Sequence, residues 1–224
     1  MFKTETHLHT AEVSPCSRIR AKEMIRRYKD SGYSTVFVTD HFQASTIEKY
    51  GDIPWDEKMS IFLAGYYLAK CEGEKIGITV LPAIEICFNR YQNNHYLVYG
   101  ITKKFLDSYP ELYTYGIEKF SEIARKEDLF IVQAHPYRDG ESFPTPEYVD
   151  AMEVYNSNPR HLDYSDKSES IAFQFGLYVS AGSDTHAPED IALSGIETGE
   201  EIKTSKQFIE LVKNKKARLI RGRK

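Results

Sequence analysis

The strongest constraint on the fold is the alternation of strand-like and helix-like stretches along the 224 residues. Residues 34–39 give the clearest strand signal, because the run Ser-Thr-Val-Phe-Val-Thr is β-branched and apolar, as in a strand buried on both faces. Before it, apolar residues recur at helical spacing between residues 21 and 28. This pattern predicts a helix with Ser17 as its N-cap and Gly32 at its end.

The rest of the chain repeats this alternation. Further strands are predicted at residues 78–86, 96–101, 129–133, 151–155, 177–181 and 217–221. Further helices are predicted over residues 57–72, 117–124, 166–175 and 205–214. Strands separated by helices imply βα units with parallel pairing. Seven or so such units favour a barrel or barrel-like sheet over an open sheet, although the pattern alone does not close it.

Composition narrows the class of protein. The chain has 41% hydrophobic and 28% charged residues, which is ordinary for a soluble globular protein. We expect one domain over residues 1–224. The net charge of −4 gives no basic stripe, so no stable nucleic-acid partner is expected. No apolar run approaches the ~20 residues of a membrane span, and no signal peptide is visible, which predicts a cytoplasmic chain without a membrane partner. Three scattered cysteines argue against a disulfide framework.

Six of the seven histidines lie at or beside the ends of predicted strands. His7 and His9 are two residues apart, so in a strand both imidazoles face the same side. The other ionisable residues at strand ends are His41, Glu85, His95, His135, Asp184 and His186. In βα barrels the functional residues lie at the C-terminal ends of strands, so these residues are expected to form one cluster. His161 lies in Asn-Pro-Arg-His, and whether it belongs to the cluster or only to a loop stays open.

Imidazole and carboxylate ligands together suit zinc, manganese or iron. A carboxylate such as Glu85 can bridge two metals at the ~3.5–4 Å separation of two-metal phosphate chemistry. The metals lower the pKa of a bridging water toward ~7 and hold the phosphoryl oxygens. The sequence therefore predicts two or three divalent metal ions that serve to cleave a phosphate ester.

The order and spacing of five motifs resemble the PHP domain (polymerase and histidinol phosphatase) superfamily, from residue 7 to about residue 200. The motifs are His7-Leu-His9, Thr39-Asp40-His41, Glu85, Ala134-His135-Pro136 and Gly182-Ser183-Asp184-Thr185-His186. The resemblance implies a distorted seven-stranded (β/α) barrel with a trinuclear metal site at its C-terminal mouth. It also implies phosphoesterase activity.

The resemblance further implies a ligand set for each metal. The first metal would take His7, His9, Glu85 and Asp184, the second His41 and His186, and the third Glu85, His95 and His135. Many members carry an Asp or His after the His-x-His motif, and residues 10–17 here contain neither. Glu12 is the best substitute, because a carboxylate suits manganese or iron. Cys16 is the second choice, and its thiolate would favour zinc. That neither residue binds also stays open.

Three more residues are candidates for the reaction itself. Asp40 would either orient His41 or act as a proton shuttle. Arg138 and Arg160 follow strand ends, and a guanidinium can hold phosphate oxygens with two hydrogen bonds. The alternative, which stays open, is that each arginine pairs with a nearby carboxylate such as Asp139 or Asp163.

The expected function is hydrolysis of a phosphomonoester or short phosphodiester by a metal-bridging hydroxide. The substrate would be a small phosphorylated molecule, such as a mononucleotide, a short oligonucleotide or a sugar phosphate. Three other functions stay open: a PHP-class protein tyrosine phosphatase, an amidohydrolase-like hydrolase of a C–N bond, and a non-catalytic module stabilised by metal.

Overall fold

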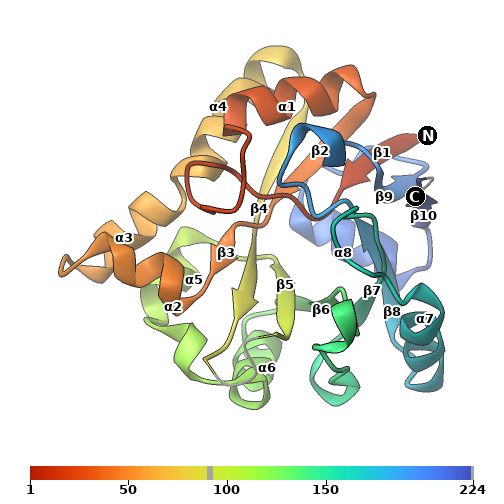
Figure 1. The fold of residues 1–224 in the computed structure, drawn as a ribbon. Coiled ribbons are helices and arrows are strands. Elements are labelled where there is room, and N and C mark those ends of the chain that lie inside the picture. The colour runs from red at the N-terminus through yellow and green to blue at the C-terminus, as the bar shows by residue number, and fades with distance from the viewer. Residues whose placement is uncertain (90–92, 223–224) are drawn as a thin grey trace.

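The computed structural model describes residues 1–89 and 93–222, whose strands form one sheet that curls into a nearly closed barrel (Figure 1). Over these residues the sheet has ten strands. They are β1 Phe2–Glu5, β2 Tyr33–Val38, β3 His41–Phe42, β4 Thr79–Cys87, β5 His95–Tyr99, β6 Phe130–Ala134, β7 Ala151–Asn156, β8 Tyr178–Gly182, β9 Ser194–Thr198 and β10 Arg218–Arg221.

Helices follow most of the strands and cover the outside of the sheet (Figure 1). They are α1 Ala21–Asp30, α2 Ala44–Ile47, α3 Trp55–Phe62, α4 Ala64–Ile76, α5 Lys103–Ser108, α6 Ile117–Lys126, α7 Ser165–Gln174 and α8 Ser205–Lys213. The pair α1 and α4 packs on β2 and β4 through a core that includes Met24, Tyr28 and Ala69. Of the helices in the described ranges, none is both long enough and apolar enough to cross a membrane.

The two edges of the sheet meet beside the residues that follow β1. The strand order is β10-β9-β1-β2-β4-β5-β6-β7-β8, and β3 continues the pairing along β4. Beyond β1, Leu8 pairs in parallel with Thr185. The N–H of His9 donates to the carbonyl of Thr185 at 3.0 Å. Closure therefore brings the His7–His9 segment against the segment after β8.

Strand β5 runs antiparallel to both of its neighbours, β4 and β6, which departs from the expected parallel pairing. Strand β9 is likewise antiparallel to its neighbours β1 and β10. Because of this direction, β5 begins where β4 and β6 end, with His95 opposite Cys87 and Ala134. A histidine at the start of β5 thus lies at the same barrel mouth as residues at the ends of the parallel strands.

Helix α8 closes the other end of the barrel. The ring of Phe208 lies 4.6 Å from that of Tyr99 and 4.8 Å from that of Phe37, centroid to centroid. Tyr99 pairs with Phe130 at the end of β5 and β6 that is farther from His95. One mouth is therefore filled by aromatic packing, which leaves the other for the ionisable residues.

All seven predicted strands are present, but the count of seven is wrong. The additional strands are short or polar: β3 has two residues, and β9 contains Gly195. Gly195 has φ of +139°, and a Cβ there would lie 2.4 Å from the carbonyl oxygen of Thr4. Strand β9 can thus approach β1 closely only with glycine at this position.

Two helix predictions also need correction. The helix predicted over 57–72 is two helices, α3 and α4, divided at Leu63. Ser17 does not cap α1, because its hydroxyl donates to the carbonyl of His9 at 2.9 Å and the N-cap residue is Arg20.

Candidate metal centre

Four buried side chains converge where the barrel closes: His7, His9, Glu85 and Asp184. The two Nε2 atoms of the histidines lie 3.1 Å apart. His7 Nε2 is 3.3 Å from Glu85 Oε1 and 3.3 Å from Asp184 Oδ1. His9 Nε2 is 3.5 Å from Glu85 Oε2 and 3.2 Å from Asp184 Oδ1.

These distances match the spacing of ligand atoms around one metal ion. Bonds of ~2.0–2.1 Å in tetrahedral geometry place neighbouring ligand atoms about 3.3–3.4 Å apart. All five measured separations lie between 3.1 and 3.5 Å. The donor set therefore fits a divalent metal, with His7, His9 and Glu85 close enough together to share one ion.

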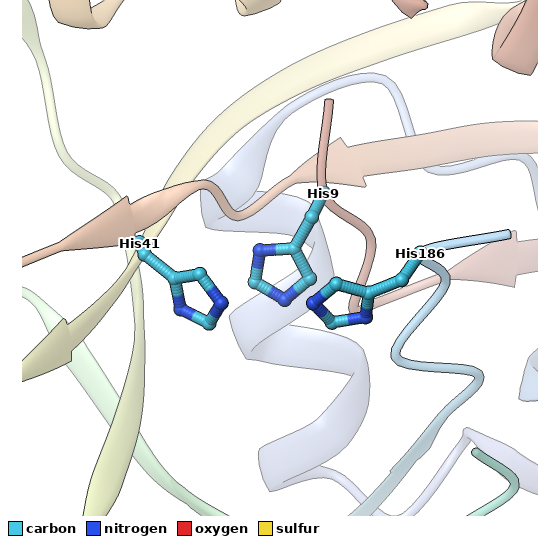
Figure 2. A group of neighbouring side chains, drawn as sticks. All are labelled: His9, His41 and His186. Carbon is cyan, nitrogen blue, oxygen red and sulfur yellow. The ribbon is translucent and has the colours of Figure 1, made fainter. Parts of the chain in front are cut away.

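A second group is formed by the imidazoles of His9, His41 and His186, with ligand nitrogens within 4.8 Å of one another. The ring of His9 lies between the other two, at centroid distances of 4.2 Å to His41 and 4.3 Å to His186 (Figure 2). Three nitrogens without a carboxylate leave room for a further ligand.

Glu85 connects these groups to a third. Its Oε1 lies 3.0 Å from His95 Nδ1 and 3.0 Å from His135 Nε2. Its Oε2 lies 2.6 Å from His41 Nδ1, yet neither of these two buried atoms has a hydrogen bond of acceptable geometry. Buried polar atoms without such a bond are rare. A cation bound beside this pair of atoms would satisfy both, as expected of a bridging carboxylate.

Ionisation prepares several of these groups for metal binding. Burial raises the pKa of both carboxyl groups, but neighbouring charges outweigh it. Nearby histidines hold the pKa of Glu85 well below the ordinary carboxyl value, and Arg138 does the same for Asp184. Burial, with His41 and His186 nearby, lowers the pKa of His9 well below its ordinary value. Ionised carboxylates and a neutral imidazole are the forms that bind metals.

The backbone is strained at two of the candidate ligands. His135 has φ of +30° and Asp184 has φ of +51°, a region that non-glycine residues rarely adopt. Such conformations cost on the order of 1–3 kcal/mol each and cluster at functional sites. His135 directly follows β6, and Asp184 lies two residues after β8, so each places a candidate ligand at the barrel mouth.

Asp40, expected to orient His41 or to move a proton, is buried and bonded to Ser14, whose hydroxyl also accepts the N–H of His41 at 3.1 Å. Its carboxylate accepts hydrogen bonds from the Thr10 N–H and the Ser14 hydroxyl, both at 2.7 Å. The Ser14 oxygen lies 3.5 Å from His9 Nδ1. Burial outweighs these hydrogen bonds and raises the pKa of Asp40 to about 6. Asp40 thus supports His9 through Ser14.

Sequence reasoning missed Glu153, a second buried carboxylate under the cluster. Its Oε1 lies 3.0 Å from His7 Nδ1, and its Oε2 accepts the N–H of His135 at 3.0 Å. The signal was present in the sequence, because a carboxylate inside the apolar run 151–155 is rarely buried without partners.

Glu5 was missed as well. Its Oε1 accepts backbone N–H groups of His7 and Ser183, both at 2.9 Å. Glu5 therefore joins the His-x-His segment to the segment that carries Asp184. It precedes His7 by two residues, a spacing that places both on one face of a strand.

The structure places the two candidates for completing the second group differently. The Glu12 carboxylate accepts the N–H of Ala21 at 2.9 Å, so it caps α1. Glu12 belongs to none of the groups described above. Cys16 lies in the cleft beside His41 and His186. Burial opposes ionisation of its thiol, but the contacts with these histidines outweigh it and lower the pKa of Cys16 to about 6.

The two arginines also differ. Arg138 lines the cleft and forms a short hydrogen bond with Asp184 Oδ2. Arg160 forms a two-bond ion pair with Asp190, at 2.8 and 2.6 Å. The expected surface partners Asp139 and Asp163 are therefore not the carboxylates that hold Arg160. Asp190 also accepts the N–H of His186 at 2.9 Å, so Arg160 supports the ligand loop from outside the cleft.

Histidines of the second and third groups line one cleft of about 320 Å³ at the barrel mouth. We call it the metal-site cleft, and its lining residues are Cys16, His41, Asn93, His95, His135, Arg138, Asp139, Glu141, His161 and His186. A cleft of this volume accommodates a small substrate.

Several solved structures share this architecture. One is a two-domain protein from Bacteroides vulgatus, described as containing a predicted PHP-like metal-dependent phosphoesterase. It matches at 14% identity and a TM-score of 0.69, over 99% of this chain and 65% of its own. PsfC from Pseudomonas syringae matches at 17% identity and a TM-score of 0.61, over 93% of this chain and 87% of its own. The lesion-specific endonuclease EndoQ from Pyrococcus furiosus matches at 15% identity and a TM-score of 0.59, over 97% of this chain and 57% of its own.

The chain thus spans less than two thirds of the Bacteroides protein and of the endonuclease. No family model matches the sequence, and no curated protein matches it. At these identities the likeness concerns the fold, and it agrees with the fold that the five motifs implied. The chain has the barrel fold of PHP-like metal-dependent phosphoesterases.

Proposed function

We propose that residues 1–224 form a single metal-dependent phosphoesterase domain that hydrolyses a phosphomonoester or short phosphodiester. The observation that carries this proposal is the close approach of ligand atoms from His7, His9, Glu85 and Asp184: each histidine Nε2 lies 3.1–3.5 Å from the other Nε2 and from an oxygen of each carboxylate. The structural neighbours named for phosphoesterase and endonuclease activities support it.

The proposed site holds two or three divalent ions of zinc, manganese or iron. The first would bind His7, His9, Glu85 and Asp184. The second would bind the histidine pair His41 and His186, and the third would bind His95, His135 and the shared carboxylate Glu85. We assign Cys16 rather than Glu12 to the second ion, because the Glu12 carboxylate is already bonded to the start of α1. A thiolate ligand there favours zinc.

Bound metals would supply an activated water and neutralise charge on the phosphate. The chain's own residues hold this chemistry in place. Glu153 fixes the ring of His7, and the Ser14–Asp40 pair supports His9. Arg138 contributes positive charge at the cleft wall, where the phosphate oxygens develop charge during the reaction.

The cleft volume suits a small phosphorylated molecule, such as a mononucleotide, a short oligonucleotide or a sugar phosphate. Cationic side chains in the cleft are few, with Arg138 as the one arginine among its described lining residues and no lysine among them. A long nucleic acid would need a series of phosphate contacts.

The test combines metal analysis with an assay. The protein is purified without chelators, its metals are quantified by inductively coupled plasma mass spectrometry, and hydrolysis of p-nitrophenyl phosphate and bis-p-nitrophenyl phosphate is measured with added manganese or zinc. We expect two or three metals per chain. We expect hydrolysis to fall at least about 100-fold in His7→Ala, with Glu122→Gln, an exposed change on α6, as the control.

Circular dichroism checks that His7→Ala remains folded, and His95→Ala, at a less buried ligand, repeats the test. Bound metal without hydrolysis of any phosphoester would count against the function and favour a metal-stabilised module or a C–N hydrolase. Absence of metal in the wild-type chain would remove the basis of the site.

A further inference from the structure

One histidine of the metal-site cleft has no place in the proposed ligand set. The chain has seven histidines, and six of them are assigned to metals above. The seventh is His161, in the loop that follows β7. It lines the same cleft as His95 and His186.

His161 is held in place by a carboxylate. Its Nδ1 lies 2.6 Å from Asp139 Oδ2, and Asp139 Oδ1 accepts the N–H of the next residue, Leu162, at 3.0 Å. Asp139 therefore fixes both the ring and the backbone beside it. Because Nδ1 is bonded to Asp139, Nε2 is the nitrogen that remains for another partner.

The pair lies against the metal-binding cluster rather than apart from it. A depression of about 10 Å³ is lined by His161 and Leu162 together with His135, Arg138 and Asn156. A space of that size holds about one water molecule. His161 is 38% exposed, so its ring is also open to a molecule that enters the cleft.

The proposed reaction needs a proton donor in the cleft for the oxygen of the leaving group. When the bond between phosphorus and the leaving oxygen breaks, the electron pair moves to that oxygen, and an alkoxide is a poor leaving group unless it is protonated. The other six imidazoles are assigned to metals, so none of them is free to donate. An Asp–His pair with an open Nε2 is the arrangement that proton donors in enzymes use.

We propose that His161 is the general acid of this site and that Asp139 positions it. This inference rests on the phosphoesterase function proposed above. Water loses one proton to solvent and adds to phosphorus as hydroxide, the bond from phosphorus to the leaving oxygen breaks, and that oxygen takes the proton from Nε2 of the protonated ring. The products are the alcohol and the phosphate, and neutral His161 regains its proton from solvent.

The dependence of rate on the leaving group tests this role. A series of substituted phenyl phosphates, and the matching phenyl esters of a nucleoside 5′-phosphate as diesters, is assayed with the metal-loaded wild type, His161→Gln and Asp139→Asn. Protonation matters most for basic leaving groups. In His161→Gln we expect kcat/KM to fall on the order of 100-fold for unsubstituted phenol as leaving group and only a few-fold for p-nitrophenol.

Asp139→Asn should steepen the same dependence to a smaller degree, because it loosens the ring without removing it. Asp166→Asn, an exposed change on α7 outside the cleft, is the matched control and should leave the dependence unchanged. Metal content should be the same in all four proteins.

An equal loss across the whole series in His161→Gln would overturn the general-acid role and indicate substrate binding instead. An unchanged series would also overturn it. If the metal-loaded wild type hydrolyses none of the esters, the phosphoesterase function fails and this inference fails with it. Hydrolysis of the p-nitrophenyl ester by His161→Gln distinguishes failure of the general-acid role from failure of the phosphoesterase function, because only the second abolishes it.

Discussion

Glu153 and His7 form a buried pair beneath the metal centre, with Glu153 Oε1 3.0 Å from His7 Nδ1. An ionised carboxylate can only accept, so His7 Nδ1 carries the hydrogen and Nε2 is left to face Glu85 and Asp184. Carboxylates that orient metal-binding histidines in this way change metal affinity when they are removed. The strand that carries Glu153 thus sets which nitrogen of His7 faces the two carboxylates.

The first prediction follows from this pair. Glu153→Gln should weaken binding of the first metal by about 10–100-fold, because the amide is a poorer acceptor and releases the ring orientation. Competition with a chromophoric chelator measures the affinity. The exposed Glu122→Gln is the control, and an affinity within a factor of two of wild type in Glu153→Gln would contradict the orienting role.

The second prediction concerns Cys16. A Co(II)-substituted protein in which this thiolate is a ligand should show a sulfur-to-cobalt charge-transfer absorption in the near ultraviolet. Cys16→Ser should abolish this band. Cys71→Ser, at the exposed cysteine of α4, should keep it and is the matched control. A band that persists in Cys16→Ser would show that the second metal does not take the thiolate.

The sequence predicted which side chains meet at the barrel mouth better than it predicted what holds them. The strand-end histidines and carboxylates could be found because parallel strands bring their C-terminal ends to one edge, and because the motif order is specific. His95 also fits, since β5 is antiparallel and starts at the same mouth. The choice between Glu12 and Cys16 could not be made, because it depends on how residues 10–19 loop back.

Long-range packing explains the other differences. The break between α3 and α4 places Gly65 against the site, where a Cβ would lie 2.1 Å from Thr10 Oγ1 and 2.9 Å from Asp40 Oδ2. The helical periodicity of residues 57–72 does not predict that contact, because it reflects only the spacing of apolar residues within the segment. Arg160 similarly pairs with Asp190, thirty residues later in the chain, rather than with the carboxylates close to it in sequence.

The third prediction separates the two arginines. Arg138→Met should lower kcat/KM for a phosphoester on the order of 10–100-fold, because it removes the cation at the cleft wall. Arg160→Met should affect stability more, because it leaves the fully buried Asp190 without its charged partner. Since Arg160 is 39% exposed, we expect a loss of roughly 1–3 kcal/mol in unfolding free energy. Urea denaturation and steady-state kinetics on both variants measure the two effects, and equal catalytic losses with unchanged stability would contradict the distinction.

The last prediction concerns pH and the contact between α1 and α4. Arg26 Nε donates to Glu72 Oε1 at 2.6 Å, and the Glu72 side chain is only 5% exposed. The hydrogen bond from Arg26 holds the pKa of Glu72 below its ordinary value of 4.5. A carboxyl whose pKa is lower in the folded chain binds fewer protons there than in the unfolded chain. Its contribution to stability is therefore present above pH 4.5 and is lost as the pH falls through the folded-state pKa.

Glu72→Gln resembles the protonated residue, so it should be less stable than wild type at pH 7 and equally stable in acid. Urea unfolding of the metal-free chain at pH 7, 5 and 3.5 measures the difference. Glu74→Gln is the matched control on α4, because the Lys70–Glu74 pair is exposed at both ends, with 46% and 65% of the side chains accessible. Exposed pairs contribute little, so its stability should follow wild type at every pH. A Glu72→Gln deficit that stays constant from pH 7 to pH 3.5 would place the effect in packing rather than in the charge of Glu72.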